Sequence, residues 1–363
     1  MSGNQYNSSS FNLRGRRPDF QRFLTALNRQ EPDRLPFAEF IIEPDIRAAF
    51  LGHLARSHVD HIEFFTQAGY DYYPIAMSIV DPGRALGGQA AKSFSIYNHA
   101  YTERTWAANT QGVISNCDDF LSYPFPSIDD MDLDVLDEIT PLLPDGMKII
   151  VIIGKLYTTN WLLQGAETFY KNIKLNVELV EMIYDKIIPL QFEVFQRVVD
   201  HPTVGAIWHP DDMAGNSGPL VNPEHLRKYV FPWYKKMGHI CQQLGKPMIF
   251  HSDGNITTLL DDVIEAQFSG IHPIDPNAMD INQVKVDFGD RLALLGNINM
   301  DFPLSRGTPA DVEELVAKRI GDLAPGGGYL LSTSNSVAEY IPIENYKAML
   351  IAGHKYGKYP IEI

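Results

Sequence analysis

The sequence predicts an α/β protein of the (β/α)₈ barrel type. Short β-rich runs recur along the chain, and from residue 147 onward they alternate with helical patterns. Several of these runs are apolar at nearly every position, which is typical of parallel strands covered on both faces. The length of 363 residues is generous for one such barrel.

Eight stretches carry the strand pattern: 35–42, 70–77, 147–153, 203–209, 246–251, 268–273, 291–297 and 328–332. The clearest helix between them begins after Thr308, a candidate N-cap that forms a capping box with Asp311, and stops at the glycines 326–328. A second helix opens with Asn222 and Pro223, and its internal Pro232 predicts a break.

The stretch 82–144 does not follow the alternation. Its segment 92–117 is strand-like without a helix, so we expect an insertion after the second strand, with a hairpin near the barrel mouth. Residues 1–17 are polar and rich in serine and arginine, and we expect a flexible tail there. The remainder, 18–363, is expected to be a single domain.

The composition narrows the class of partner. The chain has 45 acidic and 30 basic residues, a net charge of −15, which argues against nucleic acid or an anionic membrane as partner. Its two cysteines, Cys117 and Cys241, cannot build a disulfide framework or a cysteine-rich zinc cluster. No secretory signal or membrane span is expected. We expect a cytoplasmic protein with a small-molecule substrate, and a homodimer is compatible with the sequence.

Residues with polar side chains, and one glycine, follow the predicted strands at their carboxyl ends, where the active site of a barrel lies. They are Glu43, Ser78, Gly154, Tyr157, His209, Asp211, Asp212, His251, Asp253, Asp275, Asn297, Asn299, Ser334 and Asn335. These positions are acidic and contain histidines, with amides on one side. This chemistry predicts a site at the barrel mouth.

The stretch "PMIFHSDGN" carries the sharpest candidate. His251 and Asp253 are two residues apart, so they share one face if the strand continues through Ser252. His209 and Asp211 in "HPD" would repeat the arrangement on the neighbouring strand. Such side chains could hold Zn²⁺ or form a general acid/base pair. Alternatively, the aspartates cap loops and helix N-termini, and His251 is only hydrogen-bonded. The spacing leaves these interpretations open.

Four ordered blocks resemble the uroporphyrinogen decarboxylase superfamily. They are "DDMAGNSGPLVNPEHLRKYVFPWYKKM", "PMIFHSDGNITTLLDDVIEAQFSGIHPI", "LALLGNINMDFPLSRGTPADVEELV" and "GGGYLLSTSNSVAEYIPIENYKAML". The resemblance covers roughly residues 145–360 well and the first third loosely. It implies a (β/α)₈ barrel.

The resemblance implies one of two chemistries. Decarboxylases of the superfamily grip propionates with arginines of an "RQAGR" motif after the first strand, where this chain has Glu39 and Glu43. The corrinoid-linked methyltransferases include members that hold zinc with an "HxC" motif and a later cysteine. Here Asp253 replaces the first cysteine, and Asn335 stands at the later position. The resemblance therefore favours a methyltransferase with an oxygen-rich site over a decarboxylase.

We accordingly expect methyl transfer between a small methylated ether, alcohol or amine and a corrinoid, free or on a carrier protein. Zinc would be held by His251, Asp253 and Glu43, with Asp211 and Asp212 as further ligands or bases and Tyr157 as a donor over the pocket. The expected substrate contacts are Glu43, Ser78, His209, Asn216, Asn297, Asn299 and Asn335. The alternatives are decarboxylation of a tetrapyrrole or other carboxylate, and a non-catalytic binding protein on the same barrel.

Overall fold

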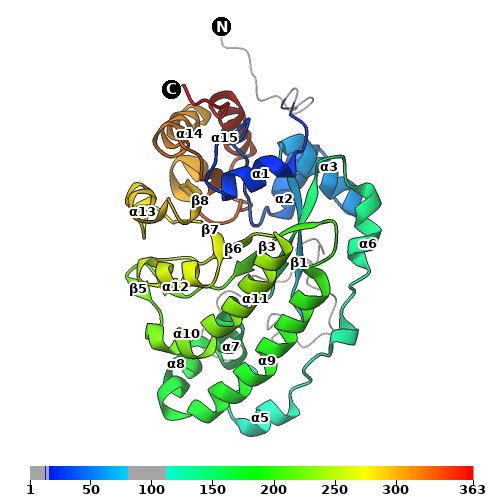
Figure 1. Ribbon diagram of the computed structural model, residues 1–363, viewed down its shortest axis with the longest axis vertical. Coiled ribbons are helices and arrows are strands. Elements are labelled where there is room, and N and C mark those ends of the chain that lie inside the picture. The colour runs from blue at the N-terminus through cyan, green and yellow to red at the C-terminus, as the bar shows by residue number, and fades with distance from the viewer. Residues whose placement is uncertain (1–12, 14–15, 81–111, 363) are drawn as a thin grey trace.

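The centre of the molecule is a parallel sheet of seven strands in the order β1-β2-β3-β6-β7-β8-β9. The computed structural model describes residue 13 and residues 16–80 and 112–362 (Figure 1). The strands are β1 (Tyr72–Met77), β2 (Lys148–Ile153), β3 (Val204–Pro210), β6 (Met248–His251), β7 (Phe268–His272), β8 (Ala293–Ile298) and β9 (Tyr329–Thr333). A separate antiparallel pair consists of β4 (Ala214–Gly215) and β5 (Gly218–Pro219).

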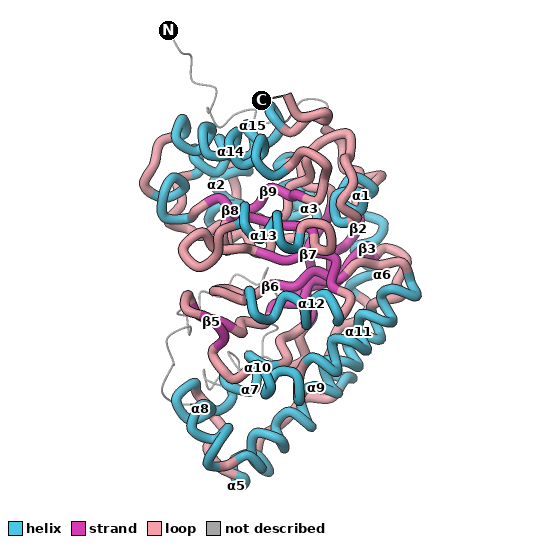
Figure 2. Tube along the Cα trace, turned by 60° about the vertical axis from the view of Figure 1, so that its left-hand side comes forward, coloured by secondary structure: helices cyan, strands magenta, loops and turns pink. Residues whose placement is uncertain are grey.

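Helices lie around the central strands (Figure 2). The α-helices are α1 (Phe20–Leu27), α2 (Pro44–Leu51), α3 (His58–Ala68), α5 (Cys117–Ser122), α6 (Val135–Ile139), α7 (Tyr157–Gln164), α8 (Ala166–Leu175), α9 (Val177–Val198), α10 (Pro223–Tyr229), α11 (Phe231–Leu244), α12 (Leu260–Glu265), α13 (Ile281–Phe288), α14 (Pro309–Leu323) and α15 (Ile343–Tyr356). Short turns of other helix types are η2 (Ile128–Asp130), η3 (Thr140–Leu142), η4 (Thr257–Leu259) and η5 (Met300–Ser305). None of the described helices combines the length and apolar character that crossing a membrane would require.

Seven of the eight predicted strands are present, with ends shifted by one or two residues. The prediction of a strand at 35–42 is wrong, because this segment makes only isolated parallel bridges, Phe37 with Leu331 and Ile42 with Val337. The N–H of Thr333 donates to the Glu39 carboxyl group at 2.7 Å instead of to a backbone carbonyl. A side chain thus interrupts the ladder with β9, and the segment lies beside β9 without forming a regular strand.

The predicted helix starts are confirmed, and α14 ends at Leu323, shortly before the glycines 326–328. Thr308 and Asp311 form the capping box of α14, with Pro309 in its first turn. The break predicted from Pro232 falls at Val230, between α10 and α11, and Pro232 then occupies the first turn of α11. Proline is tolerated there because first-turn N–H groups have no partner within the helix.

The expected insertion is only partly described, since residues 82–111 lie outside the described residues. Its remainder forms α5, η2, α6 and η3 and no strand. The expected hairpin at 92–117 lies mostly outside as well. Within the range expected as a tail, the Arg16 side chain is 1 % exposed, donates to the Leu35 carbonyl at 3.2 Å, and forms an ion pair with Asp71.

Candidate functional site

The ladder between β3 and β6 determines which residues reach the site. Pro210 pairs with His251, and partners in a ladder point to the same face of a sheet. His251 points to the interior, where its ring stacks on Phe40 with 4.5 Å between centroids. Asp212 and Asp253 each follow two residues later, so side-chain alternation carries both toward His251.

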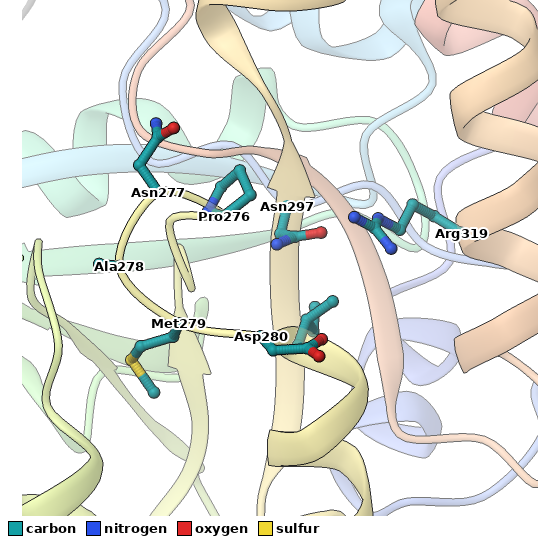
Figure 3. A pocket seen from close by; sticks show the side chains of 8 residues that line it. Pro276, Asn277, Ala278, Met279, Asp280, Asn297 and Arg319 are labelled. Atoms are coloured by element: carbon teal, nitrogen blue, oxygen red, sulfur yellow. The ribbon is translucent and has the colours of Figure 1, made fainter.

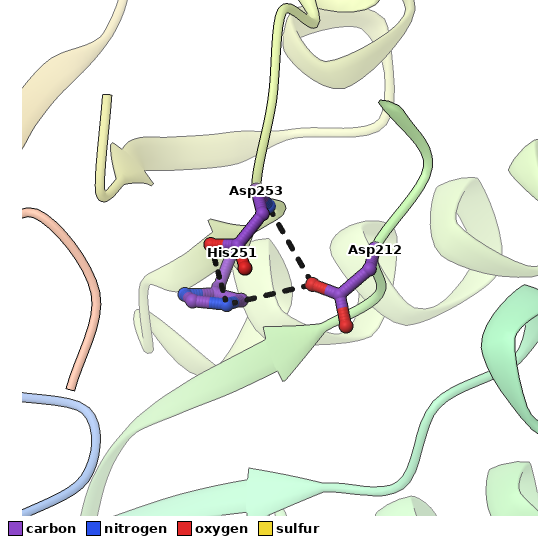
Figure 4. Close-up of side chains that lie close together, drawn as sticks. All are labelled: Asp212, His251 and Asp253. Atoms are coloured by element: carbon purple, nitrogen blue, oxygen red, sulfur yellow. Dashed lines mark hydrogen bonds and ion pairs between the residues drawn. The ribbon is translucent and has the colours of Figure 1, made fainter. Parts of the chain in front are cut away.

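Asp212, His251 and Asp253 form a three-residue cluster, which we call the triad (Figure 4). The Nε2 atom of His251 lies 3.6 Å from Oδ1 of Asp212 and 3.8 Å from Oδ1 of Asp253. One potential ligand atom from each residue lies within 4.8 Å of the others. His251 is 4 % exposed, whereas the Asp253 side chain is 38 % exposed, so the cluster opens to solvent on the Asp253 side.

The two carboxylates of the triad differ in their electrostatic surroundings. Burial opposes ionisation of Asp212, but Lys155, whose ammonium lies 3.0 Å away, and His251 outweigh it and lower the pKa of Asp212. Burial and the neighbouring Asp212 charge raise the pKa of Asp253 to about 7. Asn335 opposes that rise by donating to both Asp253 oxygens, at 2.9 and 2.8 Å. Asp212 is thus the fixed anion, and Asp253 the group that exchanges a proton near neutrality.

His251 is supported from behind by His272, its partner in the ladder between β6 and β7. The two Nδ1 atoms lie 2.7 Å apart, and Nε2 of His272 lies 2.9 Å from the Ser332 hydroxyl. Burial lowers the pKa of His251 to about 4 and that of His272 well below its ordinary value. Both rings are therefore neutral at physiological pH.

The alternative that the aspartate caps the start of a helix is wrong for Asp253, because Asn255, and not Asp253, accepts the Thr257 N–H at the start of η4. This alternative is correct for Asp211. Asp211 is fully buried and accepts the N–H groups of Leu156, Tyr157 and Thr158 at 2.7–3.1 Å. The Tyr234 hydroxyl donates to it as well, at 2.6 Å. A carboxylate at this place satisfies N–H groups at the start of α7. The Asp211 side chain therefore fixes the β2–α7 loop, while its backbone N–H donates to the His251 carbonyl at 2.8 Å.

The expected substrate contact at His209 needs correction. His209 pairs with Phe250 in the ladder, one residue out of step with His251, so it points to the helix-covered face. Its ring meets Tyr234 edge-on at 5.2 Å, and neither ring nitrogen has a hydrogen-bond partner among the described residues. Burial lowers its pKa to about 3. His209 is a neutral core residue.

Glu43 is not in the triad, which corrects its prediction as a metal ligand. Its carboxylate accepts the N–H of Glu339 at 2.8 Å. The Tyr157 hydroxyl lies 3.4 Å from that of Tyr170 on α8, so it is not brought over the triad. Asp212 takes the place in the cluster that the sequence analysis gave to Glu43.

The remaining predicted contacts are dispersed. Ser78 accepts from Gln191 at 3.1 Å, Asn216 is exposed in the turn between β4 and β5, and Asn299 caps η5. Asn297 donates to the Ile274 carbonyl at 2.9 Å. It also borders a separate cavity of about 260 Å³ whose lining includes Asp280 and Arg319 (Figure 3). Of the predicted amides, only Asn335 hydrogen-bonds to the triad.

Sequence reasoning did not single out four residues that build the site: Phe40, Lys155, His272 and Ser332. His272 is the last residue of β7, and Lys155 follows β2 by two residues. Their positions at strand ends are the sequence signal that predicts both of them in the site. Phe40 gives no such signal, because its role depends on the interrupted segment lying beside β9.

The triad fits a divalent metal. Two ligand atoms each about 2.1 Å from one ion are about 3.4 Å apart in tetrahedral geometry, close to the 3.6 and 3.8 Å found around Nε2 of His251. One imidazole and two carboxylates are a catalytic type of ligand set, which leaves a position for a substrate oxygen or water. With Asp253 ionised, the two carboxylates and Lys155 carry a net charge of −1, which a bound dication would reverse.

Comparison with protein families places the chain. The family model "Uroporphyrinogen decarboxylase (URO-D)" matches residues 128–356, which is more than half of the sequence. The chain belongs to the uroporphyrinogen decarboxylase family. This match includes every residue of the triad.

Proteins similar to this chain include methyltransferases. A methylcobamide:CoM methyltransferase MtaA of Methanosarcina barkeri is 25% identical over 178 residues, which cover 45% of this chain and half of that protein. The methyltransferase MtbA of Methanosarcina acetivorans is 22% identical over 93% of this chain and 97% of its own length. A uroporphyrinogen decarboxylase of Pseudoalteromonas atlantica is 32% identical over only 22% of each chain.

A solved structure shares the fold of this chain. The solved structure of a methyltransferase from Methanosarcina mazei has a TM-score of 0.65 and 17% sequence identity, and the match covers 96% of this chain and 99% of that one. At this identity the likeness concerns the fold, a mostly parallel sheet with helices around it.

Proposed function

We propose that this uroporphyrinogen decarboxylase family protein transfers a methyl group between a small methylated ether, alcohol or amine and a corrinoid, free or on a carrier protein. The observation that carries the proposal is the triad. Its three side chains, Asp212, His251 and Asp253, come together at the carboxyl ends of β3 and β6. The names of the similar methyltransferases support the corrinoid part, since they specify a methylcobamide.

We further infer one domain from residue 18 onward, closed as a (β/α)₈ barrel by the segment 35–42. This segment bridges to β9 on one side, and the Tyr72 hydroxyl of β1 donates to the Glu39 carbonyl at 2.7 Å. Active sites of such barrels lie at the carboxyl ends of the strands, and the triad follows β3 and β6 at that end. The two free cysteines fit the cytoplasm.

The triad would hold a divalent cation, with Zn²⁺ our first choice. Such an ion, when bound, acts as a Lewis acid on a substrate oxygen. Lys155 keeps Asp212 ionised, and His251 is neutral, so both are ready as ligands. Neither Cys117 nor Cys241 belongs to the triad. Oxygen ligands suit a substrate oxygen or nitrogen better than the thiol of CoM.

Asp253 has a second property that suits the reaction. It is the most exposed member of the triad, and without a bound cation its pKa of about 7 would let it take or give a proton at working pH. A demethylated alcohol or amine needs a proton when it leaves. Acid/base chemistry by Asp253 is therefore the alternative to its role as a metal ligand, because a bound dication would lower its pKa. Asn335 donates to its carboxyl group at 2.8 Å.

A spectroscopic assay tests the proposal. Cob(I)alamin is mixed with the protein and a panel of aryl methyl ethers, methanol and methylamines, and the absorbance of methylcob(III)alamin is followed. We expect product with at least one substrate class, and a loss of at least about 100-fold in His251→Ala. The matched control, His209→Ala, removes a histidine outside the triad. Equal rates in wild type and His251→Ala, or no methyl transfer with any class, would overturn the proposal.

A further inference from the structure

A cavity of about 260 Å³ lies where the β7–α13 loop, β8 and α14 meet (Figure 3). Loop residues 276–281, Asn297 of β8 and Arg319 of α14 line it, and no residue of the triad does. A single water needs only about 10–15 Å³ of such volume. The cavity is therefore large enough for a small organic molecule.

Two side chains at this cavity have polar atoms without a partner. Asn297 is 1 % exposed, and its amide group donates to the Ile274 carbonyl at 2.9 Å. Only the NH₂ group can donate to a carbonyl, so this bond fixes which atom is Oδ1. Among the described residues, neither Oδ1 of Asn297 nor the buried Nε of Arg319 has a hydrogen-bond partner. Buried polar groups are normally paired, so we expect a ligand that serves both atoms.

Asp280 adds the opposite charge to the same cavity. Its carboxylate accepts the N–H of Asn282 at 2.9 Å and thereby caps α13, and its exposed side chain borders the cavity. In Figure 3 the carboxamide of Asn297 and the guanidinium of Arg319 face each other, with the Asp280 carboxylate beside them. The charges of Arg319 and Asp280 cancel, so the cavity favours neither a net anion nor a net cation.

We propose that this cavity binds a small zwitterion of the α-amino acid type. Arg319 holds its carboxylate, because a guanidinium offers a carboxylate two parallel N–H donors. Asp280 and Oδ1 of Asn297 accept from its ammonium group, which has three N–H donors. A simple carboxylate leaves the two acceptors unpaired, and a simple amine leaves Arg319 unpaired. The site is separate from the triad, so it stands independently of the proposed function.

Calorimetry on the full-length protein tests the ligand class. Glycine, alanine and serine are titrated beside acetate, which has only the carboxylate, and ethylamine, which has only the ammonium group. We expect at least one of the amino acids to bind with a Kd of about 1 mM or lower. Acetate and ethylamine should bind at least about 10-fold more weakly, since each leaves buried groups of the cavity without a partner.

Charge-removing variants identify the residues that hold the ligand. Arg319→Gln should weaken amino acid binding at least about 10-fold, because it removes the charged partner of the carboxylate. Its matched control is Lys318→Gln, one residue earlier on α14, whose side chain is 62 % exposed and pairs with Asp322. Asp280→Asn keeps a side chain that caps α13 and removes only the charge, so it should also weaken binding about 10-fold. Melting temperatures of all variants check that the fold is kept.

A second readout locates the ligand at Arg319. In protein labelled with ¹⁵N-arginine, the Nε–H resonance that is missing in Arg319→Gln belongs to Arg319, and it should shift when the amino acid is added. The proposal is overturned if none of the three amino acids binds up to about 10 mM. Acetate or ethylamine binding as tightly as the amino acid, an unmoved Arg319 resonance, or an equal loss of affinity in Lys318→Gln and Arg319→Gln would overturn it as well.

Discussion

Pro210 of β3 and His251 of β6 are partners in one parallel ladder, and this pair selects the aspartate that reaches the site. Because Pro210 shares the face of His251, Asp212 extends toward the imidazole. Asp211, one residue earlier, turns to the other side and meets Tyr234 and the start of α7. Adjacent aspartates thus have different tasks, one in the site and one in the fold.

Replacing each aspartate separates these tasks. Asp212→Asn should weaken Zn²⁺ binding about 10- to 100-fold and cost about 1 kcal/mol of unfolding free energy, since it removes a charge at the metal and the partner of Lys155. Asp211→Asn should cost about 2–4 kcal/mol, because buried N–H and O–H donors lose a carboxylate acceptor. Calorimetry and denaturant unfolding on both variants check this. If Asp211→Asn weakened metal binding as much as Asp212→Asn, the assignment of Asp211 to the fold and Asp212 to the metal site would be wrong.

The two strand-end histidines should respond oppositely to the same substitution. His209→Phe places an aromatic ring in an aromatic pocket and removes two unpartnered nitrogens, so the unfolding free energy should stay within about 1 kcal/mol of the wild type or rise. Metal binding should be unchanged. His251→Phe should keep the fold and lose the metal, since it removes the nitrogen ligand. Loss of metal binding in His209→Phe would contradict the assignment of His209 to the core.

Glu39 should make the protein less stable as pH rises. Burial raises its pKa to about 8 in the folded state, against opposing hydrogen bonds from Thr333 and Ser332, and an unfolded glutamate titrates near 4.3. Between these values the folded chain holds a proton that the unfolded chain has released. The stability contribution is therefore full below the unfolded pKa and is lost as pH approaches and passes about 8.

Glu39→Gln removes this dependence. The unfolding free energy of the wild type relative to Glu39→Gln should fall by ~2 kcal/mol or more between pH 5 and 9. Parallel urea titrations at each pH measure the difference. A difference that is constant with pH would show that Glu39 does not change its pKa on folding.

Uroporphyrinogen should not be decarboxylated at a rate above the uncatalysed control. A substrate with many carboxylates would approach Asp212 and Asp253, and like charges repel in a partly buried site. Incubation with the substrate followed by chromatography of the porphyrin products checks this. Rapid appearance of coproporphyrin would favour the decarboxylase alternative over methyl transfer.

The sequence predicted the local elements well and the convergence of the site less well. Continuous apolar runs and caps located seven strands and the α14 helix, because these signals are local. The pairing of His251 and Asp253 also follows from spacing alone. The third residue of the triad does not follow from spacing. Asp212 can be distinguished from Glu43 and Asp211 only when the register between β3 and β6 is known. The stacking of Phe40 likewise depends on a segment whose ladder is interrupted by its own Glu39.

The triad should bind one divalent cation. Titration of chelator-treated, full-length protein with Zn²⁺ by calorimetry tests it most directly, with His251→Ala and Asp253→Asn beside the wild type. We expect one equivalent bound by the wild type, none by His251→Ala, and binding weakened about 10- to 100-fold in Asp253→Asn. The same weak uptake by all three proteins, with the variants altered only in melting temperature, would contradict the claim.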